Sequence, residues 1–367
     1  MTKKIVIGII ISLMLTGCSN AAIRSETPGV VVATETHEPV TESEPTTELS
    51  NEPATESMEK NPKEAIDLSL NPNEAGKIMV LMYHNIGDEE KEWVRTPENF
   101  KKDLLTLYEN GYRPISLRDY VSGNITTPQG YTPVVITFDD GKKNNFEYLE
   151  DGSLDKNSAV GILIDFNKQY PDFSPAATFF IYGNNIFGQK GLEEDKIKFL
   201  LENGMDIGNH SRTHANFTQI SKEDLQMEIG AQAQFLESFI KDAAYSIDTM
   251  ALPFGTRPKE DSIKDFLKEG IYNGIAYKNV AILNVGWNPG YSPYDTRFDF
   301  GNIPRIRASE MKVETFGLYN YIEHFKNKPE DRFISDGFPD IITVPEAKAE
   351  LITTESTKEI YIYKESK

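Results

Sequence analysis

The sequence of 367 residues has few cysteine, histidine and basic residues. Its one cysteine, Cys18, excludes an intrachain disulfide and a cysteine-based zinc site, so a metal would need histidine or carboxylate ligands. There are 38 Lys+Arg against 57 Asp+Glu, and the resulting net charge of −19 disfavours nucleic acid as a partner. Hydrophobic residues make up only 39% of the chain, so part of its length is expected to stay outside a core.

Aromatic side chains are also missing between Cys18 and Tyr83, and residues 19–59 consist mainly of Thr, Glu, Ser, Pro and Ala. A segment of this composition cannot bury enough apolar surface to offset the entropy that ordering costs. Its excess of acidic over basic side chains makes it repel itself and extend. We therefore expect residues 18–75 to form a disordered acidic stalk in front of a folded domain.

The first residues have the layout of an export signal. Lys3 and Lys4 precede an apolar run, residues 5–15, that is too short to span a bilayer, for which about 20 residues are needed. The run leads into Leu15-Thr-Gly-Cys18, which resembles the lipobox of bacterial lipoproteins. This resemblance implies that residues 1–17 are removed and that Cys18 is lipidated. The expected location is the extracellular face of the cell membrane, with the protein held by this lipid.

Short apolar runs alternate with helical patterns from about residue 76 onward. This alternation is typical of an α/β fold with a largely parallel sheet, and the number of runs is enough for a barrel. The runs that we interpret as strands are residues 78–83, 112–115, 134–138, 177–181, 206–208, 250–253, 273–276 and 303–306. The folded domain is expected over residues 76–330, followed by a C-terminal extension over residues 331–367.

Capping residues predict where several helices begin and end. Ser and Thr side chains commonly cap helix starts, and glycine commonly follows helix ends. We expect helices to start at Thr96, Ser158 and Ser221, and two others to end at Gly204 and Gly270.

Two carboxylates end the apolar run at residues 134–138. Asp139 and Asp140 follow it directly, and Gly141 allows a sharp turn away. The carboxyl end of a parallel strand is where α/β barrels place their active sites. Capping of the following turn is the alternative role for these aspartates.

A second cluster contains two of the five histidines in the chain, His210 and His214. In a helical turn this spacing places both imidazoles on one face, where they can hold one metal ion. Two histidines and one carboxylate would form a three-ligand site with an open position for water, and the second carboxylate would remain as a general base. Two structural histidines are the alternative interpretation.

Three motifs resemble the first three motifs of the polysaccharide deacetylase family, the NodB-homology domains of carbohydrate esterase family 4. They are Thr137-Phe-Asp-Asp140, His210-Ser-x-x-His214 and Leu252-Pro-Phe-Gly255, and the resemblance covers roughly residues 78–307. It implies a distorted (β/α) barrel of about seven to eight strands. It also implies a divalent metal, most commonly Zn²⁺, and removal of acetyl groups from N-acetylated or O-acetylated sugars.

The resemblance also assigns roles to individual residues. Asp139 corresponds to the catalytic base, and Asp140, His210 and His214 correspond to the metal ligands. The backbone N–H of Phe254 corresponds to a group that helps to hold the oxyanion.

The sequence departs from the family pattern at two places. Many members have an arginine that orients the catalytic aspartate where this chain has Ala251, and Arg257, Arg305 and Arg307 are candidates to replace it. Many members also have a catalytic histidine on the last strand, which is absent from residues 303–307. In lacking this histidine, the sequence resembles the branch of the family that deacetylates poly-N-acetylglucosamine. A Tyr-His pair is common in that branch, so His84 is expected to line the site as a catalytic residue. A structural histidine that holds the first loop is the alternative.

A Gly- and Pro-rich loop before the last predicted strand contains Trp287 and Tyr291. Sugars stack on aromatic rings, so we expect both residues, together with Arg305, to bind the substrate. Trp287 as a core residue is the alternative. The expected partner is an acetylated polysaccharide, and the protein is expected to be a monomer.

The favoured function is therefore a metal-dependent deacetylase of a cell-surface polysaccharide. One rival is a catalytically idle glycan-binding lipoprotein that has lost the motif arginine and the acid. A second rival keeps the chemistry but acts on peptidoglycan, chitin oligomers or acetylated xylan.

Overall fold

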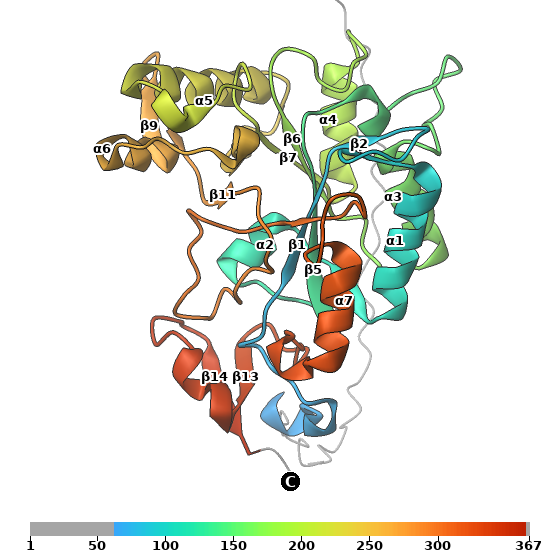
Figure 1. Cartoon of the computed structure of the whole chain (residues 1–367), viewed down its shortest axis with the longest axis vertical. Coiled ribbons are helices and arrows are strands. Elements are labelled where there is room, and N and C mark those ends of the chain that lie inside the picture. The colour runs from blue at the N-terminus through green and yellow to red at the C-terminus, as the bar shows by residue number, and fades with distance from the viewer. Residues whose placement is uncertain (1–61, 365–367) are drawn as a thin grey trace, which may run out of the picture. The chain divides into compact units, whose positions relative to one another are not determined.

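A parallel sheet lies at the centre of the computed structural model, which describes residues 62–364 (Figure 1). The described residues belong to one compact unit. Cys18, the predicted signal and the predicted stalk up to residue 61 lie outside them. The predicted disorder is wrong for residues 62–75, because they form two 3₁₀ turns and end in a buried segment that is hydrogen-bonded to the domain. Within the described part of the chain, no helix has the length and apolar character needed to cross a bilayer.

The central sheet has eight strands, and every pairing within it is parallel. Seven of them lie in the order β11-β8-β7-β6-β5-β1-β12, and β4 pairs with β5. Their bounds are β1 Met79–Tyr83, β4 Tyr112–Pro114, β5 Thr132–Phe138, β6 Thr178–Ile181, β7 Asp206–Asn209, β8 Thr249–Ala251, β11 Ala281–Leu283 and β12 Ile306–Arg307. All eight strands are buried along their whole length, as expected for a parallel sheet that is covered on both faces.

One segment links the two edges of this sheet. The N–H of Ile303 donates to the carbonyl of Ile282 on β11, and the N–H of Asn284 donates to the carbonyl of Ile303. A few residues later, Ile306 on β12 pairs with Leu81 on β1. The strands therefore curve into a distorted (β/α) barrel, as predicted from the sequence.

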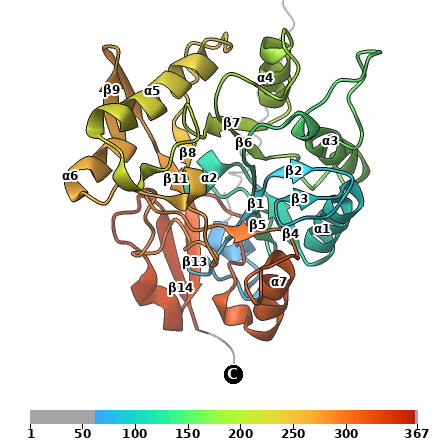
Figure 2. The same cartoon turned by 45° about the horizontal axis from the view of Figure 1, so that its top comes forward.

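Helices surround the strands (Figures 1 and 2). Their bounds are α1 Pro97–Glu109, α2 Leu117–Ser122, α3 Ala159–Gln169, α4 Glu193–Glu202, α5 Lys222–Glu237, α6 Asp261–Lys264 and α7 Leu318–Asn327. Short 3₁₀ turns cover Pro62–Ala65, Leu68–Leu70, Lys143–Asn145, Phe217–Gln219, Pro253–Gly255, Asp265–Leu267, Pro329–Asp331 and Glu346–Leu351. The side chains of Thr96, Ser158 and Ser221 cap α1, α3 and α5, which confirms the three predicted starts.

Alternate residues of the strands enter different cores. Met79 and Leu81 on β1 belong to a cluster with side chains of α1, α3 and α4, whereas Val80 belongs to a second cluster. This alternation follows from the opposite directions of successive side chains along a strand. Side chains of the same short strands thus pack alternately into the barrel interior and against the outer helices.

One predicted strand and one predicted helix end are wrong. Residues 273–276 lie in an antiparallel hairpin of β9 Glu269–Tyr272 and β10 Ile275–Lys278, outside the central sheet, and Gly270 lies within β9. Asn273 and Gly274 both have positive φ, 49° and 78°, which the tight turn of a two-residue hairpin requires. The Asn-Gly dipeptide is the sequence signal for this hairpin, and β11 takes the place in the sheet. The other predicted end is confirmed, because Gly204 follows α4 with a positive φ.

Two further strand pairs lie outside the central sheet. β2 Asn85–Ile86 pairs with β3 Val94–Arg95, and β13 Ile341–Pro345 pairs with β14 Glu359–Tyr363. The segment after residue 331 also contacts the segment before β1, because the N–H of Asn73 donates to the carbonyl of Ile334. Residues before and after the barrel therefore meet beside it.

Candidate active site

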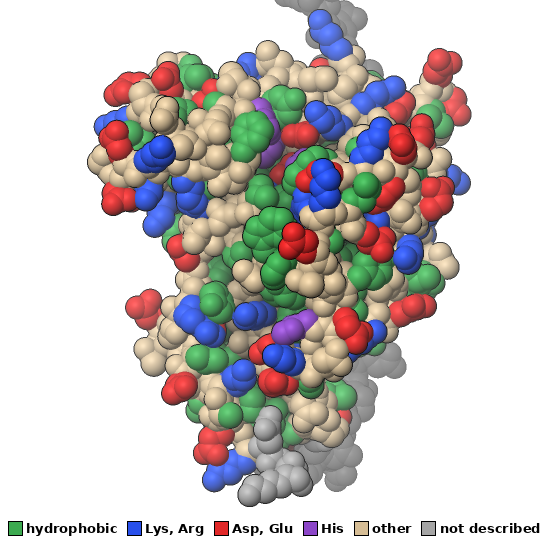
Figure 3. All heavy atoms as spheres, viewed as in Figure 1, with side chains coloured by type: hydrophobic (Ala, Val, Ile, Leu, Met, Phe, Trp, Pro, Cys, Tyr) green, Lys and Arg blue, Asp and Glu red, His purple; other side chains and the backbone are tan. Residues whose placement is uncertain are grey.

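The predicted catalytic and metal-binding side chains lie at the carboxyl ends of the central strands. Asp139 and Asp140 follow β5, His210 follows β7, and His84 follows β1. Because all of these strands are parallel, their carboxyl ends share one edge of the sheet. In the view of Figure 3, histidine side chains lie beside acidic and hydrophobic side chains in the upper part of the molecule.

Three of these residues form a cluster of potential metal donors. The Oδ1 atom of Asp140 lies 3.7 Å from the Nε2 atom of His210 and 3.7 Å from the Nε2 atom of His214. All three donor atoms lie within 4.8 Å of one another. In a tetrahedral zinc site with bonds of 2.0–2.1 Å, donor atoms are roughly 3.4 Å apart. The three predicted ligands are therefore brought together, and their donor set fits a divalent cation.

A hydrogen bond orients the His210 ring. Its Nδ1–H donates to the backbone carbonyl of Ala251 over 2.8 Å, so the lone pair of Nε2 is directed toward Asp140. The ring is buried, with 2% of the side chain exposed. A donor hydrogen bond from the other nitrogen is the usual device that fixes the tautomer of a metal-binding histidine.

Left-handed backbone conformations occur at two of the donor residues and at a residue between the two histidines. Asp140, Ser211 and His214 have φ of 76°, 67° and 57°, although none of them is glycine. Each such conformation costs about 1–3 kcal/mol and persists where the surroundings enforce it. The side chain of Asn209 enforces it here by accepting the N–H of Ser211 over 2.8 Å. Glu228 on α5 holds the same loop, because it accepts the N–H and the hydroxyl of Thr213.

The predicted base, Asp139, is paired with Arg305. The Nη1 and Nη2 atoms of Arg305 donate to Oδ1 and Oδ2 of Asp139, each over 2.7 Å. Both residues are buried, with exposures of 0% for Arg305 and 1% for Asp139. Burial alone would raise the pKa of Asp139, but the attraction of the guanidinium outweighs burial and holds this pKa well below its usual value. Asp139 is therefore ionised throughout the neutral range.

This pairing settles where the missing motif arginine is supplied. Of the three candidates, Arg305 contacts Asp139, whereas Arg257 binds the Asn284 side chain and Arg307 binds Glu92. The prediction that Arg305 binds the substrate is wrong, because its buried guanidinium is engaged with Asp139. Sequence reasoning could not choose among the three arginines, since 166 residues separate the paired side chains.

His84 is brought to the same site. Its Nε2 atom lies 3.9 Å from Oδ2 of Asp139, and its ring packs 4.7 Å from the ring of Trp93. Burial lowers the pKa of His84, although the nearby Asp139 carboxylate acts in the opposite direction. The imidazole is therefore neutral in the resting protein at neutral pH. Trp93, on the β2–β3 connection, was not among the predicted site residues.

Aromatic side chains border the donors. Phe254, in the 3₁₀ turn Pro253–Gly255, has 61% of its surface exposed, and its ring lies 4.5 Å from the His214 ring. Trp287 is 47% exposed. Its ring and the Trp93 ring lie 5.5 and 4.8 Å from the guanidinium carbon of Arg307. Trp287 is therefore not a core residue.

Tyr291 is not brought to this site. The neighbouring Gly290 pairs with Ile78, which precedes β1, whereas His84 follows the opposite end of that strand. Five strand residues at about 3.3 Å each separate these two ends. The prediction that Tyr291 binds the substrate is wrong, because its Gly/Pro-rich loop runs from one end of the barrel to the other.

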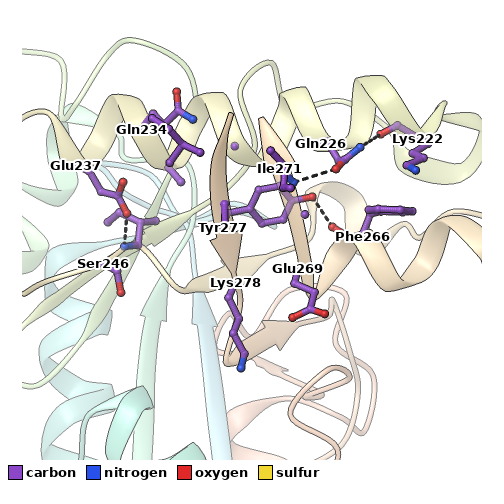
Figure 4. A pocket seen from close by; sticks show the side chains of 16 residues that line it. Lys222, Gln226, Gln234, Glu237, Ser246, Phe266, Glu269, Ile271, Tyr277 and Lys278 are labelled. Atoms are coloured by element: carbon purple, nitrogen blue, oxygen red, sulfur yellow. Dashed lines mark hydrogen bonds between the residues drawn. The ribbon is translucent and has the colours of Figure 1, made fainter. Parts of the chain in front are cut away.

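A separate cavity lies between α5 and the β9–β10 hairpin (Figure 4). Its volume is about 780 Å³, and its lining includes Gln226, Gln234 and Tyr277. Hydrogen bonds join Gln226 to the N–H of Ile271 and Gln234 to the carbonyl of Tyr272, so these amides hold the hairpin to the helix. Its lining contains none of the donor residues described above.

Comparisons with known proteins agree with the motifs. A family model described as polysaccharide deacetylase matches residues 168–270. The protein YxkH of Bacillus subtilis (strain 168), classed by name with the polysaccharide deacetylases, is 23% identical over 249 residues, which are 66% of this chain and 76% of the relative. The predicted resemblance to the polysaccharide deacetylase family is confirmed.

Solved structures show the same fold. BC0361, a polysaccharide deacetylase from Bacillus cereus, has a TM-score of 0.50 and 20% identity over 67% of this chain and 68% of its own. BA0330 from Bacillus anthracis, classed in the same way, has the same TM-score, identity and coverage. The matched family region includes His210 and His214 but ends before Arg305. The fold thus agrees with the fold of these polysaccharide deacetylases. The pairing of Asp139 with Arg305 comes from the structure of this chain and not from the family match.

Proposed function

We propose that this protein is a metal-dependent deacetylase that hydrolyses acetyl groups of an N-acetylated polysaccharide at the cell surface. The observation that carries the proposal is the Asp139–Arg305 pair beside the three donors of Asp140, His210 and His214. The family match supports a hydrolase that deacetylates polysaccharide. Two histidines with one carboxylate favour Zn²⁺ among the divalent cations.

Each residue near the donors has a chemical task in this proposal. Asp140, His210 and His214 would hold a divalent cation, which when bound would lower the pKa of water and polarise the acetyl carbonyl. Asp139, kept ionised and fixed in place by Arg305, takes a proton from the attacking water. The water oxygen bonds to the acetyl carbon, the C–N bond breaks, and acetate leaves. The Phe254 ring lies 4.5 Å from the His214 ring, and we assign stabilisation of the oxyanion to the backbone N–H of Phe254.

The proton taken by Asp139 must reach the leaving nitrogen. His84 lies 3.9 Å from Asp139 and is neutral at rest, so it can accept this proton and deliver it. We therefore assign proton delivery to His84. Protonation of His84 at low pH would prevent it from accepting this proton. Replacing His84 by Ala should therefore remove its contribution to the acid limb of the pH–rate profile, together with most of the rate. An unchanged profile would leave Asp139 as the group that returns the proton itself.

The Asp139–Arg305 pair argues against an idle glycan-binding protein. A buried carboxylate and guanidinium are costly to desolvate, and metal binding by the other three residues does not require them. The suggestion of lost activity depended on the absent arginine at Ala251. Arg305 makes the contact that this arginine would make.

The substrate class follows from the residues bordering the donors. Residues 303–307 carry no histidine, as in the branch acting on poly-N-acetylglucosamine. The exposed ring of Trp287 offers a face on which a neighbouring sugar can stack. We propose a polymer of N-acetylated sugars, with peptidoglycan, chitin oligomers and acetylated xylan as the alternatives to be compared.

Acetate release from a panel of these four glycans tests the function. The zinc-loaded protein should release acetate from the N-acetylglucosamine polymer, and a chelator should abolish the release until zinc is restored. Preference for another glycan would change the substrate assignment. Binding of glycans without acetate release from any of them would overturn the enzymatic proposal.

We also propose that lipid at Cys18 holds the protein at the extracellular face of the membrane. The support is the lipobox-like Leu15-Thr-Gly-Cys18, which lies outside the described residues. In cells that express the Cys18→Ala variant, the protein should leave the membrane fraction, since one anchor is then missing. Retention of this variant in the membrane fraction would contradict the assignment.

A further inference from the structure

The two oxygens of the Asp140 carboxylate have different surroundings. Oδ1 faces the Nε2 atoms of His210 and His214, each 3.7 Å away. Oδ2 faces the ammonium of Lys142, with 3.6 Å between Oδ2 and Nζ. One carboxylate is thus shared between the donor cluster and a lysine that follows it by two residues.

The turn after β5 brings this lysine beside the Asp140 carboxylate. Asp140 and Gly141 have φ of 76° and 59°, and these two successive left-handed residues reverse the chain. The reversal is fixed by packing, because a Cβ on Gly141 would lie 3.0 Å from the Ile181 side chain. Lys142 then resumes an extended backbone, with φ of −68° and ψ of 154°. Its position is therefore set by the same turn that aims Asp140.

A second contact holds the ammonium in place. Nζ of Lys142 lies 5.5 Å from the centre of the Tyr182 ring, a cation–π distance, and this ring lies 5.0 Å from the His214 ring. The Lys142 side chain is 45% exposed, and its ion pair with Asp140 joins it to the donor cluster. Lys142 thus contacts one donor directly and another through an aromatic ring.

A carboxylate can ligate a cation through one oxygen or through both. A partner at the outer oxygen favours ligation through one oxygen, and such outer contacts orient ligating carboxylates in metal sites. The positive charge of Lys142 also repels a cation that approaches Oδ2. Both effects leave Oδ1 as the atom that faces the histidines.

We propose that Lys142 is a positioning residue that limits Asp140 to ligation through Oδ1 and so keeps a coordination position free for water. The inference rests on the metal site of the proposed function. It assigns to Lys142 a role that neither the three motifs nor the donor cluster requires.

Lys143 provides a matched control. It is the next residue, its side chain is 49% exposed, and its ammonium pairs with Glu147 over 2.8 Å. Replacing either lysine by Met removes one positive charge from the same turn. Only the Lys142 change removes the partner of Oδ2.

The test compares wild type, Lys142→Met, Lys142→Arg and Lys143→Met as zinc-loaded proteins. Crystal structures give the distance from zinc to Oδ2, competition with a chelator gives the zinc dissociation constant, and acetate release gives kcat and KM. In Lys142→Met, Oδ2 should move into the bonding range of about 2.0–2.2 Å, and kcat should fall about 10–100-fold with little change in KM. Lys142→Arg should restore the wild-type distance, and Lys143→Met should match wild type.

The outcomes separate this inference from the proposed function. If wild type binds zinc and releases acetate but Lys142→Met keeps Oδ2 outside the bonding range with an unchanged kcat, the role of Lys142 is overturned alone. Equal losses in Lys142→Met and Lys143→Met would also overturn it, because a general charge effect would explain them. If wild type binds no zinc, the proposed function and this inference fail together.

Discussion

Adjacent aspartates have opposite environments in this protein. Asp139 is buried and bound by both arms of the Arg305 guanidinium, whereas Asp140 turns toward His210 and His214. Both residues follow β5, and the left-handed backbone of Asp140, with φ of 76°, brings its carboxylate to the histidines. The division between a base and a potential metal ligand therefore follows from the turn that begins directly after the strand.

This division predicts two classes of variant. Asp140→Ala, His210→Ala and His214→Ala should each lose bound zinc and activity, because each removes a donor. Asp139→Asn should keep its zinc and lose about 10²–10⁴-fold in rate, because it removes only the base. Elemental analysis beside rate measurements distinguishes the classes. Full zinc occupancy in one of the alanine variants would remove that residue from the ligand set.

Arg305 predicts the pH dependence on the acid side. Burial raises the pKa of Asp139 and Arg305 lowers it, so an Arg305→Met variant should have a higher Asp139 pKa. A base must be deprotonated to act, so the acid limb of the pH–rate profile should move to higher pH. Arg305→Lys should move it less, since it keeps the charge but loses the paired hydrogen bonds.

The same change should lower stability. An unpaired buried carboxylate typically costs about 3–5 kcal/mol, which denaturant unfolding of Arg305→Met would measure. Arg257→Met serves as the control, because Arg257 contacts the Asn284 side chain and not Asp139. An acid limb at the wild-type position in Arg305→Met would show that Arg305 does not set the Asp139 pKa.

At the scale of elements, the helix α5 supports the loop that carries His214. Glu228 on α5 accepts the N–H of Thr213 over 2.8 Å and its hydroxyl over 2.6 Å. Glu228 is 3% exposed, so these bonds form in a buried environment where they are costly to lose. A helix of the outer layer thus holds the loop that carries a potential metal donor.

Replacing Glu228 by Ala should therefore loosen His214 without touching a donor. We expect weaker zinc binding by about 10–100-fold, the range typical of outer contacts of metal ligands. The measurement is the zinc dissociation constant from competition with a chelator. Glu237→Ala, near the other end of α5, is the control, and equal losses in both variants would point to general damage of the helix.

The strands and the site differ in how far sequence can predict them. β5 is predictable because a buried parallel strand contains a run of apolar residues, and the two aspartates that follow it mark the site. β7 contains one large apolar residue, Ile207, and the histidine that follows the strand marks its end. The β9–β10 hairpin departs from the prediction, because the short run at residues 273–276 resembles a core strand although it contains the turn of the hairpin. The partner of Asp139 could not be predicted, because contacts across the barrel leave no local pattern.

At the scale of the whole molecule, segments on both sides of the barrel meet at a buried acidic pair. Glu74 precedes β1, and Asp336 follows the last helix. Oε2 of Glu74 accepts the N–H of Thr343 over 3.1 Å, and Oδ2 of Asp336 accepts the Thr343 hydroxyl over 2.6 Å. Burial raises the pKa of Glu74 well above its usual value, and the neighbouring Asp336 carboxylate raises it further.

This pair predicts how stability depends on pH. A carboxyl with a raised pKa in the folded state contributes stability that is fully present below its unfolded pKa, near 4.5 for Glu74. The contribution is lost as the pH rises through the folded pKa, because the carboxylate must then ionise while buried. Glu74→Gln is neutral at every pH, so wild type should lose more stability than this variant between about pH 5 and about pH 8.

Thermal unfolding across this pH range tests the expectation for the zinc-free proteins. The Tm of Glu74→Gln relative to wild type should increase steadily with pH, because only wild type has Glu74 to ionise. Glu64→Gln is the control, since Glu64 is exposed on the turn Pro62–Ala65 and its removal should leave the Tm difference constant. Parallel Tm curves for wild type and Glu74→Gln would mean that the Glu74 carboxyl has the same proton affinity in the folded and unfolded chains, in which case the link between the two ends of the domain is independent of pH.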